Sequence, residues 1–317
     1  MDGKKVFLII SSYYIGDILL ANPLIQNIRA IYDDAHIVML TPPSMVDAAK
    51  YQEGVDDVVV WDRHGIHHGW QNMLKFIWKF PYKKIFAAFP IYSGDRAITL
   101  AFLLGAKYIL GQHRSIVGTL LKSKYKINYN IFDGVQGQNV SILSGLTKEP
   151  LVNYPMKYNL PDFQSDICNI KEEYIALCPT SSRIEKDMPK EDVCKIIESL
   201  DCKVVLLGRG ETAKQLSELI KNKNYTNLID LTDKTSFLEF AKIINLSKGC
   251  ISVDTGSLHL ACALNKPTVG IYYKKLNWGY SPDSKIYPNV YCESDLTPEQ
   301  IVEKITALSK IEICQIK

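Results

Sequence analysis

The sequence lacks any apolar run long enough to cross a lipid bilayer as a helix, which takes about 20 consecutive residues. A short apolar run, residues 6–10, follows two lysines near the start, but it is too short for the apolar part of a signal peptide. Polar residues and Asp17 come next, without a small-residue cleavage site. We therefore expect residues 5–10 to form a buried first strand, and the protein to be cytoplasmic.

A strong charge of either sign is also lacking, since 37 Lys and Arg residues face 34 Asp and Glu residues, for a formal net charge of +3. That charge is too small to indicate a nucleic-acid binder, so we expect no nucleic acid as partner. It is compatible with a phosphorylated substrate or a transient visit to an anionic membrane surface. The 8 cysteines include no C-x-x-C pair and mostly lie in apolar runs, which favours reduced, buried thiols over a disulfide framework or a metal site.

What the chain does have is a regular alternation of strand-like apolar runs and amphipathic helical stretches. The first series of expected strands comprises residues 5–10, 35–40, 58–61, 85–89 and 108–110. The second series comprises residues 174–178, 203–207, 228–231, 250–253 and 267–271. This rhythm predicts an α/β protein with parallel sheets, in which ligands bind at the carboxyl ends of the strands.

A length of 317 residues exceeds what one hydrophobic core usually supports, so we expect two domains. Residues 148–166 contain three prolines and no clear periodicity, and they read as the linker. We place the domains at residues 1–155 and 156–317, with their strand ends facing a central cleft. A last helix is predicted from Thr297 as N-cap and Pro298 as first helical residue. Packing of this helix back on the N-terminal domain is left open.

The most informative segment is the apolar run 250–264, which breaks at Asp254-Thr255-Gly256 and resumes with helical spacing. It predicts a strand, a tight turn and a helix whose free N–H groups and dipole favour an anion such as phosphate. Thr255, Gly256 and Ser257 would form the cradle, Asp254 can cap the helix, and His259 would lie near the mouth of the crevice. Taken alone, the segment is equally compatible with one of the many such turns that bind nothing.

Two further loops could contact a nucleotide. The loop 179–189 carries Ser181 and Ser182, which can donate to phosphate oxygens, and Lys186, which can supply a positive charge to a diphosphate. The alternative is an ordinary solvated loop. Gly208 and Glu211 follow another expected strand, where an acid could accept from a ribose hydroxyl, although two glycines without a third are a weak signal.

In the first domain, Gly16 and Asp17 follow the first strand at the start of a helix. An ordinary N-cap is the simpler interpretation of Asp17. Its place at the carboxyl end of the strand also suits a general base that deprotonates a substrate hydroxyl.

The order of these motifs along the chain is more specific than any one of them. In chain order they are residues 16–20 with Pro23 and Leu24, Gly105 and Ala106 with Gly111, residues 179–189, 205–208, 230–232 with 235–239, 254–256 followed by 259–261, 267–272, and Trp278 and Gly279 with Pro282. Over nearly the whole chain, this series resembles the glycosyltransferase family 9 heptosyltransferases, which build the inner core of lipopolysaccharide.

The resemblance implies a GT-B fold, with two Rossmann-like domains, the first binding mainly the acceptor and the second mainly the nucleotide sugar. It implies an inverting transfer of heptose from ADP-heptose as donor substrate, without a metal or other cofactor. By position, Asp17 would be the base and Lys186 the second catalytic group. The donor site would comprise Ser181, Ser182, Lys186, Gly208, Glu211, Asp254, Thr255, Gly256 and His259. The acceptor site would comprise Gly16, Arg63, His67 and Arg96.

Two departures from the family pattern stand out. Met188 occupies the position before Pro189 where many relatives carry tryptophan, so the packing of that loop differs. His64, His67 and His68 lie close together, but no Cys or carboxylate completes a tetrahedral set, and an aromatic, weakly basic acceptor loop is the favoured interpretation over a metal site.

The sequence therefore predicts an inverting glycosyltransferase that adds heptose to a lipid-linked core oligosaccharide of lipopolysaccharide or lipooligosaccharide. It would work at the cytoplasmic face of the inner membrane, in transient contact with the membrane surface. Alternatives are a transferase of the same fold with another nucleotide sugar, and a nucleotide-sugar 2-epimerase. A binding protein that has lost catalysis is disfavoured by the presence of both Asp17 and Lys186.

Overall fold

The computed structural model describes residues 3–11, 14–91, 94–111, 126–273 and 278–310. The chain divides into two compact units, Met1–Met156 and Lys157–Lys317. The division falls inside the proline-containing segment 148–166, which in the structure has no helix or strand before a short 3-10 turn at its end. The two units are called the N-terminal and C-terminal domains below.

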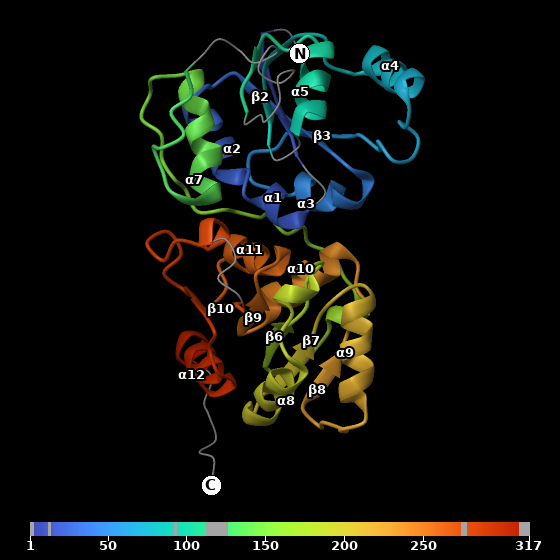
Figure 1. The fold of residues 1–317 in the computed structure, drawn as a ribbon, viewed down its shortest axis with the longest axis vertical. Helices are drawn as coiled ribbons and strands as arrows, with labels where there is room; N and C mark the ends of the chain where they lie inside the picture. The colour runs from blue at the N-terminus through green and yellow to red at the C-terminus, as the bar shows by residue number, and fades with distance from the viewer. Residues whose placement is uncertain (1–2, 12–13, 92–93, 112–125, 274–277, 311–317) are drawn as a thin grey trace. The chain divides into compact units, whose positions relative to one another are not determined.

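The N-terminal domain is built on a parallel sheet with the strand order β3-β2-β1-β4-β5. Its strands are β1 (Lys5–Ile10), β2 (Ala35–Thr41), β3 (Asp57–Val60), β4 (Ile85–Pro90) and β5 (Tyr108–Ile109). Its helices are α1 (Ile15–Leu19), α2 (Asn22–Ile31), α3 (Val46–Lys50), α4 (Trp70–Lys79), α5 (Gly94–Leu103) and α7 (Gly134–Ser141), with short 3-10 turns η1 (Pro43–Met45) and η2 (Ile142–Gly145). In Figure 1, α2 and α7 lie on one side of this sheet and α4 and α5 on the other.

The C-terminal domain has a second parallel sheet, with the order β11-β10-β9-β6-β7-β8. Its strands are β6 (Tyr174–Cys178), β7 (Lys203–Leu206), β8 (Leu228–Asp230), β9 (Gly249–Val253), β10 (Thr268–Tyr272) and β11 (Val290–Ser294). Its helices are α8 (Lys190–Ser199), α9 (Glu211–Lys221), α10 (Phe237–Leu246), α11 (Gly256–Ala263) and α12 (Pro298–Ser309), with 3-10 turns η3 (Asp166–Cys168), η4 (Ile184–Lys186) and η5 (Trp278–Tyr280).

The predicted fold class, two parallel-sheet α/β domains, is confirmed. All ten predicted strands form, with ends that differ by one or two residues at most. The central strands β1, β6 and β9 are buried almost throughout, which explains why they read as continuous apolar runs. The structure adds the edge strand β11, which the sequence pattern did not reveal because the strand is largely half-exposed and carries Glu293.

Helix α12 begins as predicted, with Thr297 as N-cap and Pro298 as its first residue. Thr297 and Gln300 form a capping box, in which each side chain accepts a hydrogen bond from the other residue's backbone N–H. The helix packs against α8, β9 and β10 of its own domain. Its apolar face, including Ile301 and Ile305, is buried in the core of its own domain.

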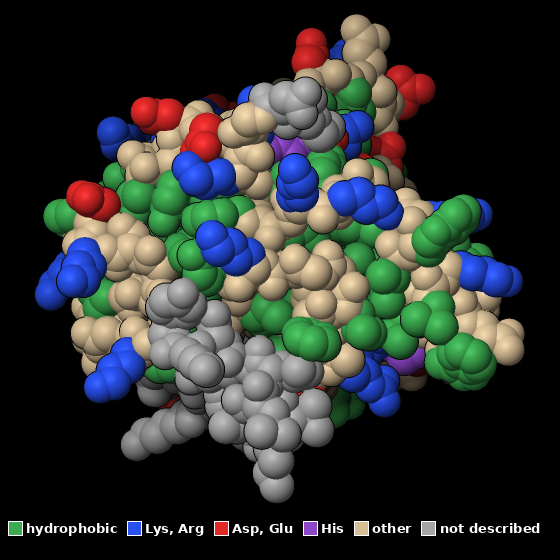
Figure 2. All heavy atoms as spheres, turned by 90° about the horizontal axis from the view of Figure 1, so that it is seen from above, with side chains coloured by type: hydrophobic (Ala, Val, Ile, Leu, Met, Phe, Trp, Pro, Cys, Tyr) green, Lys and Arg blue, Asp and Glu red, His purple; other side chains and the backbone are tan. Residues whose placement is uncertain are grey.

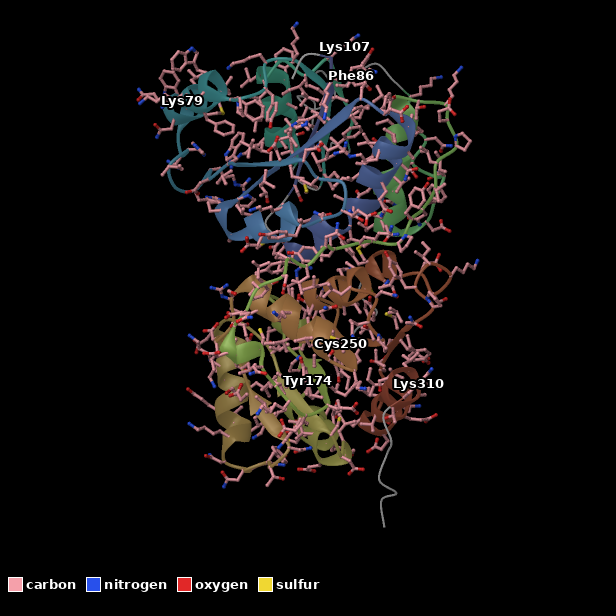
Figure 3. The ribbon with its side chains drawn as sticks, turned by 180° about the vertical axis from the view of Figure 1, so that it is seen from behind. Lys79, Phe86, Lys107, Tyr174, Cys250 and Lys310 are labelled. Carbon is pink, nitrogen blue, oxygen red and sulfur yellow. The ribbon has the colours of Figure 1, made fainter. Side chains whose placement is uncertain are left out.

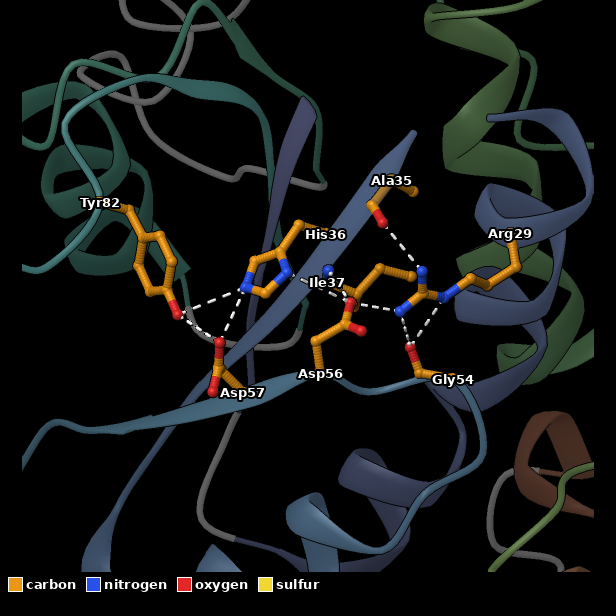
Figure 4. A network of polar contacts seen from close by, with 8 residues as sticks. All are labelled: Arg29, Ala35, His36, Ile37, Gly54, Asp56, Asp57 and Tyr82. Carbon is orange, nitrogen blue, oxygen red and sulfur yellow. Dashed lines mark hydrogen bonds and ion pairs between the residues drawn. The ribbon is translucent and has the colours of Figure 1, made fainter. Parts of the chain in front are cut away.

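Polar side chains close the amino end of the N-terminal sheet in a continuous network, drawn in Figure 4. Asp57 accepts a hydrogen bond of 2.5 Å from the Tyr82 hydroxyl and pairs at 2.8 Å with His36 Nε2. Asp56 accepts from the backbone N–H of Ile37 at 2.7 Å and pairs with Arg29. Arg29 also donates to the backbone carbonyls of Ala35 and Gly54. The described groups of this network satisfy one another.

Seven cysteines lie in the described part of the chain, none of them in a disulfide. Cys202 and Cys292 are half-buried and the other five are buried, in line with the expectation of reduced thiols. Cys314 lies outside the described residues. Within the described residues, no helix combines the length and the hydropathy that a membrane crossing requires.

Candidate functional site

The C-terminal sheet reverses its strand order between β6 and β9, which are hydrogen-bonded neighbours. Ligands in open parallel sheets bind outside the carboxyl ends of the strands at such a point. Lys186 comes from the loop after β6 and Asp254 from the turn after β9. The Lys186 ammonium donates to the Asp254 carboxylate, with 2.5 Å between Nζ and Oδ2, and lies 3.3 Å from the Asp254 carbonyl. Two predicted donor-side residues therefore meet at the expected place.

The turn after β9 leads directly into α11. Thr255 is the N-cap of this helix, and no side chain caps it. The prediction that Asp254 caps the helix is wrong, because its carboxylate is buried and paired with Lys186 instead. Thr255 and Gly256 are half-buried at the helix start, while the Ser257 hydroxyl lies 2.7 Å from that of Ser252 inside the core. The helix start thus offers N–H groups that no described side chain caps, next to the Lys186 ammonium.

His259 lies on α11 one turn further along and is 3% exposed. It is therefore in the core behind the turn and not at the mouth of a crevice, as the sequence suggested. Its Nδ1 is buried and has no hydrogen-bond partner in the structure. Burial lowers the pKa of His259 to about 4, with Asp254 opposing this shift and Lys186 adding to it.

The loop after β6 is held together by its own hydroxyl and carboxylate groups. The Ser181 hydroxyl donates to the Arg183 carbonyl at 2.7 Å and accepts from the Arg183 N–H at 2.9 Å. The Asp187 carboxylate accepts from the Ser181 N–H at 2.6 Å, and burial of Asp187 raises the pKa of that carboxyl. Ser182 is exposed. The folded loop ends in η4, which positions Lys186 toward Asp254.

Gly208 and Glu211 lie at the junction between β7 and α9. A Cβ added to Gly208 would come within 2.8 Å of Ala213 Cβ and 3.0 Å of the Thr180 hydroxyl, so close packing of helix on strand requires glycine there. Glu211 is exposed in the first turn of α9, and its carboxylate accepts from Gln215 at 3.0 Å. No described contact joins either residue to Lys186 or Asp254.

The N-terminal domain contains a cavity of about 960 Å³ at the carboxyl ends of β1, β2 and β3. It is lined by Asp17, the predicted base, together with three residues predicted to bind the acceptor, Arg63, His67 and Arg96. Gly16 is next to Asp17 in α1 but is not among the lining residues. Residues of the loop 61–69, of α4 and of α5 also line the cavity.

Three lining groups that the sequence analysis missed are buried polar atoms without a hydrogen-bond partner in the structure. They are the hydroxyls of Ser11 and Thr41 and the indole N–H of Trp61. Ser11 follows β1 directly, Thr41 ends β2 and Trp61 follows β3, so they form a row along three neighbouring strand ends. Buried polar groups are nearly always hydrogen-bonded, so such a row indicates a polar ligand site. The sequence does contain a signal for these three groups, because each is a polar or amphipathic residue at the end of an apolar, strand-like run.

The histidines of the loop 61–69 make local contacts. His67 Nδ1 accepts from the Asp62 N–H at 3.0 Å, and its ring packs on Phe76 with 4.7 Å between ring centres. Burial lowers the pKa of His67, and Asp62 opposes this shift. His64 Nε2 accepts from Arg63 Nε at 3.0 Å. Across the described residues, no group of three or more His, Cys, Asp or Glu side chains is arranged to hold a metal ion.

Comparison with known proteins finds a family match for one segment of the chain. Residues 140–288 match the family described as glycosyltransferase family 9 (heptosyltransferase). This segment, slightly less than half of the chain, is similar to glycosyltransferase family 9. Lipopolysaccharide heptosyltransferase 3 of Escherichia coli K12 is 26% identical to this chain over 112 residues. That match covers 34% of this chain and about a third, 33%, of the relative's length.

Solved structures extend the similarity from the segment 140–288 to the fold of nearly the whole chain. The glycosyl transferase family 9 protein of Veillonella parvula superposes with a TM-score of 0.81 at 16% identity, covering 98% of this chain and 99% of that one. ADP-heptose lipopolysaccharide heptosyltransferase II of E. coli superposes with a TM-score of 0.75 at 16% identity, covering 96% and 98%. The chain therefore has the GT-B fold of these proteins.

The segment that matches family 9 includes every predicted donor-side residue, from Ser181 to His259. The cavity that holds Asp17, Arg63, His67 and Arg96 lies before the matched segment, in the part of the chain where only the fold is shared with solved structures. The segment similar to family 9 therefore contains the predicted donor-side residues, whereas the cavity on the acceptor side lies outside it.

Proposed function

We propose that this protein transfers heptose from ADP-heptose to a lipid-linked core oligosaccharide of lipopolysaccharide, with inversion at the anomeric carbon. The observation that carries the proposal is the Lys186–Asp254 pair beside the start of α11, at the strand-order reversal within the segment that matches family 9. This arrangement fits the two phosphates of a nucleotide sugar. One protein of similar fold is an E. coli heptosyltransferase whose structure was solved with ADP.

On the donor side, the departing diphosphate needs positive charge as the sugar leaves. Lys186 supplies one full charge, and the free N–H groups at the start of α11 supply partial charge. These groups do the work that a metal ion does in other transferases, so we propose a reaction with no cofactor. Asp254 holds Lys186 in place before the donor arrives.

On the acceptor side, Asp17 lines the cavity of the N-terminal domain and would take the proton of the attacking hydroxyl. Arg63 and Arg96 line the same cavity and would attract the anionic groups of a core oligosaccharide. The unpartnered groups of Ser11 and Thr41 would bond sugar hydroxyls. A lipid-linked acceptor implies work at the cytoplasmic face of the inner membrane, in transient contact with the bilayer.

The test is calorimetric binding of ADP, ADP-heptose, UDP and GDP, followed by turnover with a core acceptor. We expect binding of the adenine ligands only. Lys186→Ala should weaken ADP binding by about 10- to 100-fold, because a charge-assisted hydrogen bond is lost. Lys195→Ala, which removes an exposed lysine from α8, is the matched control and should bind as the unmodified protein does. Asp17→Asn should keep ADP-heptose binding and lower turnover by at least about 100-fold.

A buried carboxylate without its partner can itself destabilise the domain, so Lys186→Ala is paired with Lys186→Ala/Asp254→Asn, which removes both charges. Weak ADP binding by a folded double variant supports the role of Lys186. Preferential binding of UDP or GDP would overturn the donor. Near-normal turnover by Asp17→Asn would overturn the base.

A further inference from the structure

Helix α4 of the N-terminal domain presents an apolar stripe to solvent. Trp70, Leu74 and Trp78 follow one another at four-residue spacing, so they lie on one face, and their exposed fractions are 67%, 46% and 78%. The opposite side of the helix packs on the domain, because Phe76 is buried in the domain core, and Met73 beside the stripe lines the cavity. A surface helix normally places polar residues on its outer side. A second apolar face therefore indicates a contact that the isolated chain does not make.

The charge around this stripe is of one sign. Lys75 and Lys79 each follow a stripe residue directly in the sequence and are exposed, and Lys83 and Lys84 are exposed just beyond the helix. No Asp or Glu occurs between residues 70 and 84. Figure 2 shows hydrophobic side chains interspersed with Lys and Arg at the edge of the molecule where Figure 1 places α4. Lys79 is labelled at that outer edge in Figure 3.

We propose that the α4 face, meaning the stripe of Trp70, Leu74 and Trp78 with the exposed Lys75 and Lys79 at its side, docks on an anionic phospholipid bilayer. Exposed tryptophans next to lysines match the interface of such a bilayer, where the rings enter the headgroup region and the ammonium groups meet lipid phosphates. A segment with four lysines and no acidic residue is complementary to anionic lipid. A second copy of the chain would bring four lysines against the same four lysines, which repel.

The α4 face lies next to the cavity of the N-terminal domain. Trp70 belongs both to the α4 face and to the lining of the cavity that holds Asp17 and Arg63. A bilayer on α4 would therefore lie at the rim of that cavity, where the sugar part of a lipid-linked molecule could enter while its lipid stays in the membrane. The docking itself stands on the surface alone, whereas this delivery step rests on the proposed function.

Vesicle sedimentation tests the docking without any substrate. We expect the protein to bind phosphatidylcholine vesicles that contain phosphatidylglycerol, and to bind pure phosphatidylcholine vesicles far less. Lys75→Gln/Lys79→Gln should weaken binding by about 30-fold, at roughly 1 kcal/mol per lysine. Leu74→Gln/Trp78→Gln should weaken it by about tenfold or more. Leu219→Gln, an equally exposed leucine on α9, is the matched control and should bind normally.

Each contrary outcome overturns the docking. Equal binding to both vesicle types would remove the role of charge, and unchanged binding by both double variants would place the contact elsewhere. Absence of vesicle binding, with a concentration-dependent dimer that Leu74→Gln/Trp78→Gln abolishes, would make a second copy the occupant. Thermal unfolding checks that each variant is folded, as expected for exposed positions.

Turnover separates the docking from the proposed function. Leu74→Gln/Trp78→Gln should retain activity on a water-soluble, delipidated acceptor and lose it on an acceptor embedded in vesicles. Vesicle binding without ADP-heptose binding would support the docking and overturn the heptosyl transfer. Full activity of the variant on the embedded acceptor would overturn the delivery step.

Discussion

At one end of the N-terminal sheet polar side chains are hydrogen-bonded to one another, and at the other end buried polar side chains lack partners in the structure. At the amino end, His36 at the start of β2 joins Asp57 and Tyr82 in the network of Figure 4. At the carboxyl end of the same strand, the Thr41 hydroxyl is buried without a partner. The first arrangement stabilises the fold, because each group finds its bond within the chain. The second costs stability and leaves bonding capacity for a ligand.

The C-terminal sheet repeats the second pattern at its carboxyl edge. His259 Nδ1 is buried and unpartnered beside the turn after β9, where Lys186 and Asp254 meet. Both domains therefore have buried polar groups without a partner near the carboxyl ends of their strands, which is where ligands of parallel sheets bind. We therefore expect removal of a paired group to lower stability, and removal of an unpaired one to weaken ligand binding without lowering stability.

The largest expected effect is at the paired end. Asp57→Ala removes the acceptor of the Tyr82 hydroxyl and the partner of His36, both of which lie in largely buried residues. We expect the free energy of unfolding in urea to fall by about 3 kcal/mol, because two buried groups lose a partner, although the Asp57 side chain is itself 45% exposed. ADP binding should not change, because the network belongs to the N-terminal domain and the predicted donor-side residues to the C-terminal domain.

Asp34→Ala is the control on the same domain. Asp34 pairs with Lys5 at 2.8 Å, but both side chains are about two-fifths exposed, at 39% and 40%. Such a pair contributes under about 1 kcal/mol. If the two variants lost equal stability, the closed network at the amino end would have no special role in the fold.

The second effect is a pH dependence from His259, whose pKa falls to about 4 because of burial. The unfolded chain, with a pKa near 6.5, binds this proton more readily than the folded one, so acidification favours unfolding. The loss begins as the pH drops through about 6.5 and is complete below about 4; between pH 7 and about pH 5 it amounts to about 2 kcal/mol.

Urea unfolding at both pH values measures this contribution. His259→Gln carries no titrating ring, so its stability should fall by about 2 kcal/mol less over the same interval than that of the unmodified chain. His67→Gln is the control, because the His67 ring is less buried and should account for a smaller part of the change. An unaltered pH dependence in His259→Gln would mean that this ring is not held neutral by the fold.

Much of the fold was predictable because the central strands are buried on both faces and read as apolar runs, as β1 and β6 do. The half-exposed edge strand β11 has no such pattern. Within the site, the spacing of polar residues after each strand located Lys186 and Asp254 on the correct loops. It could not reveal that Asp254 pairs with Lys186, 68 residues away, because a capping residue and a long-range partner look alike in sequence.

The sequence likewise does not show whether a buried hydroxyl has a hydrogen-bond partner. The smallest predicted effect distinguishes the two cases. Thr41→Val replaces an unpartnered buried hydroxyl by a methyl group of similar size. We expect the free energy of unfolding to rise by about 1 kcal/mol, because a desolvated polar group disappears. The KM for the acceptor should rise about fivefold, since the ligand loses a hydrogen bond worth about 1 kcal/mol.

Thr268→Val makes the identical change at the start of β10, where the threonine is equally buried but its hydroxyl donates to the Lys266 carbonyl at 2.8 Å. This variant should lose about 1 kcal/mol of stability, because the carbonyl loses its donor. Opposite signs for the two threonines would establish that the carboxyl end of the N-terminal sheet gives up stability for bonding capacity. Equal losses would mean that the Thr41 hydroxyl is already satisfied in solution, and the contrast between the two ends of the sheet would no longer hold.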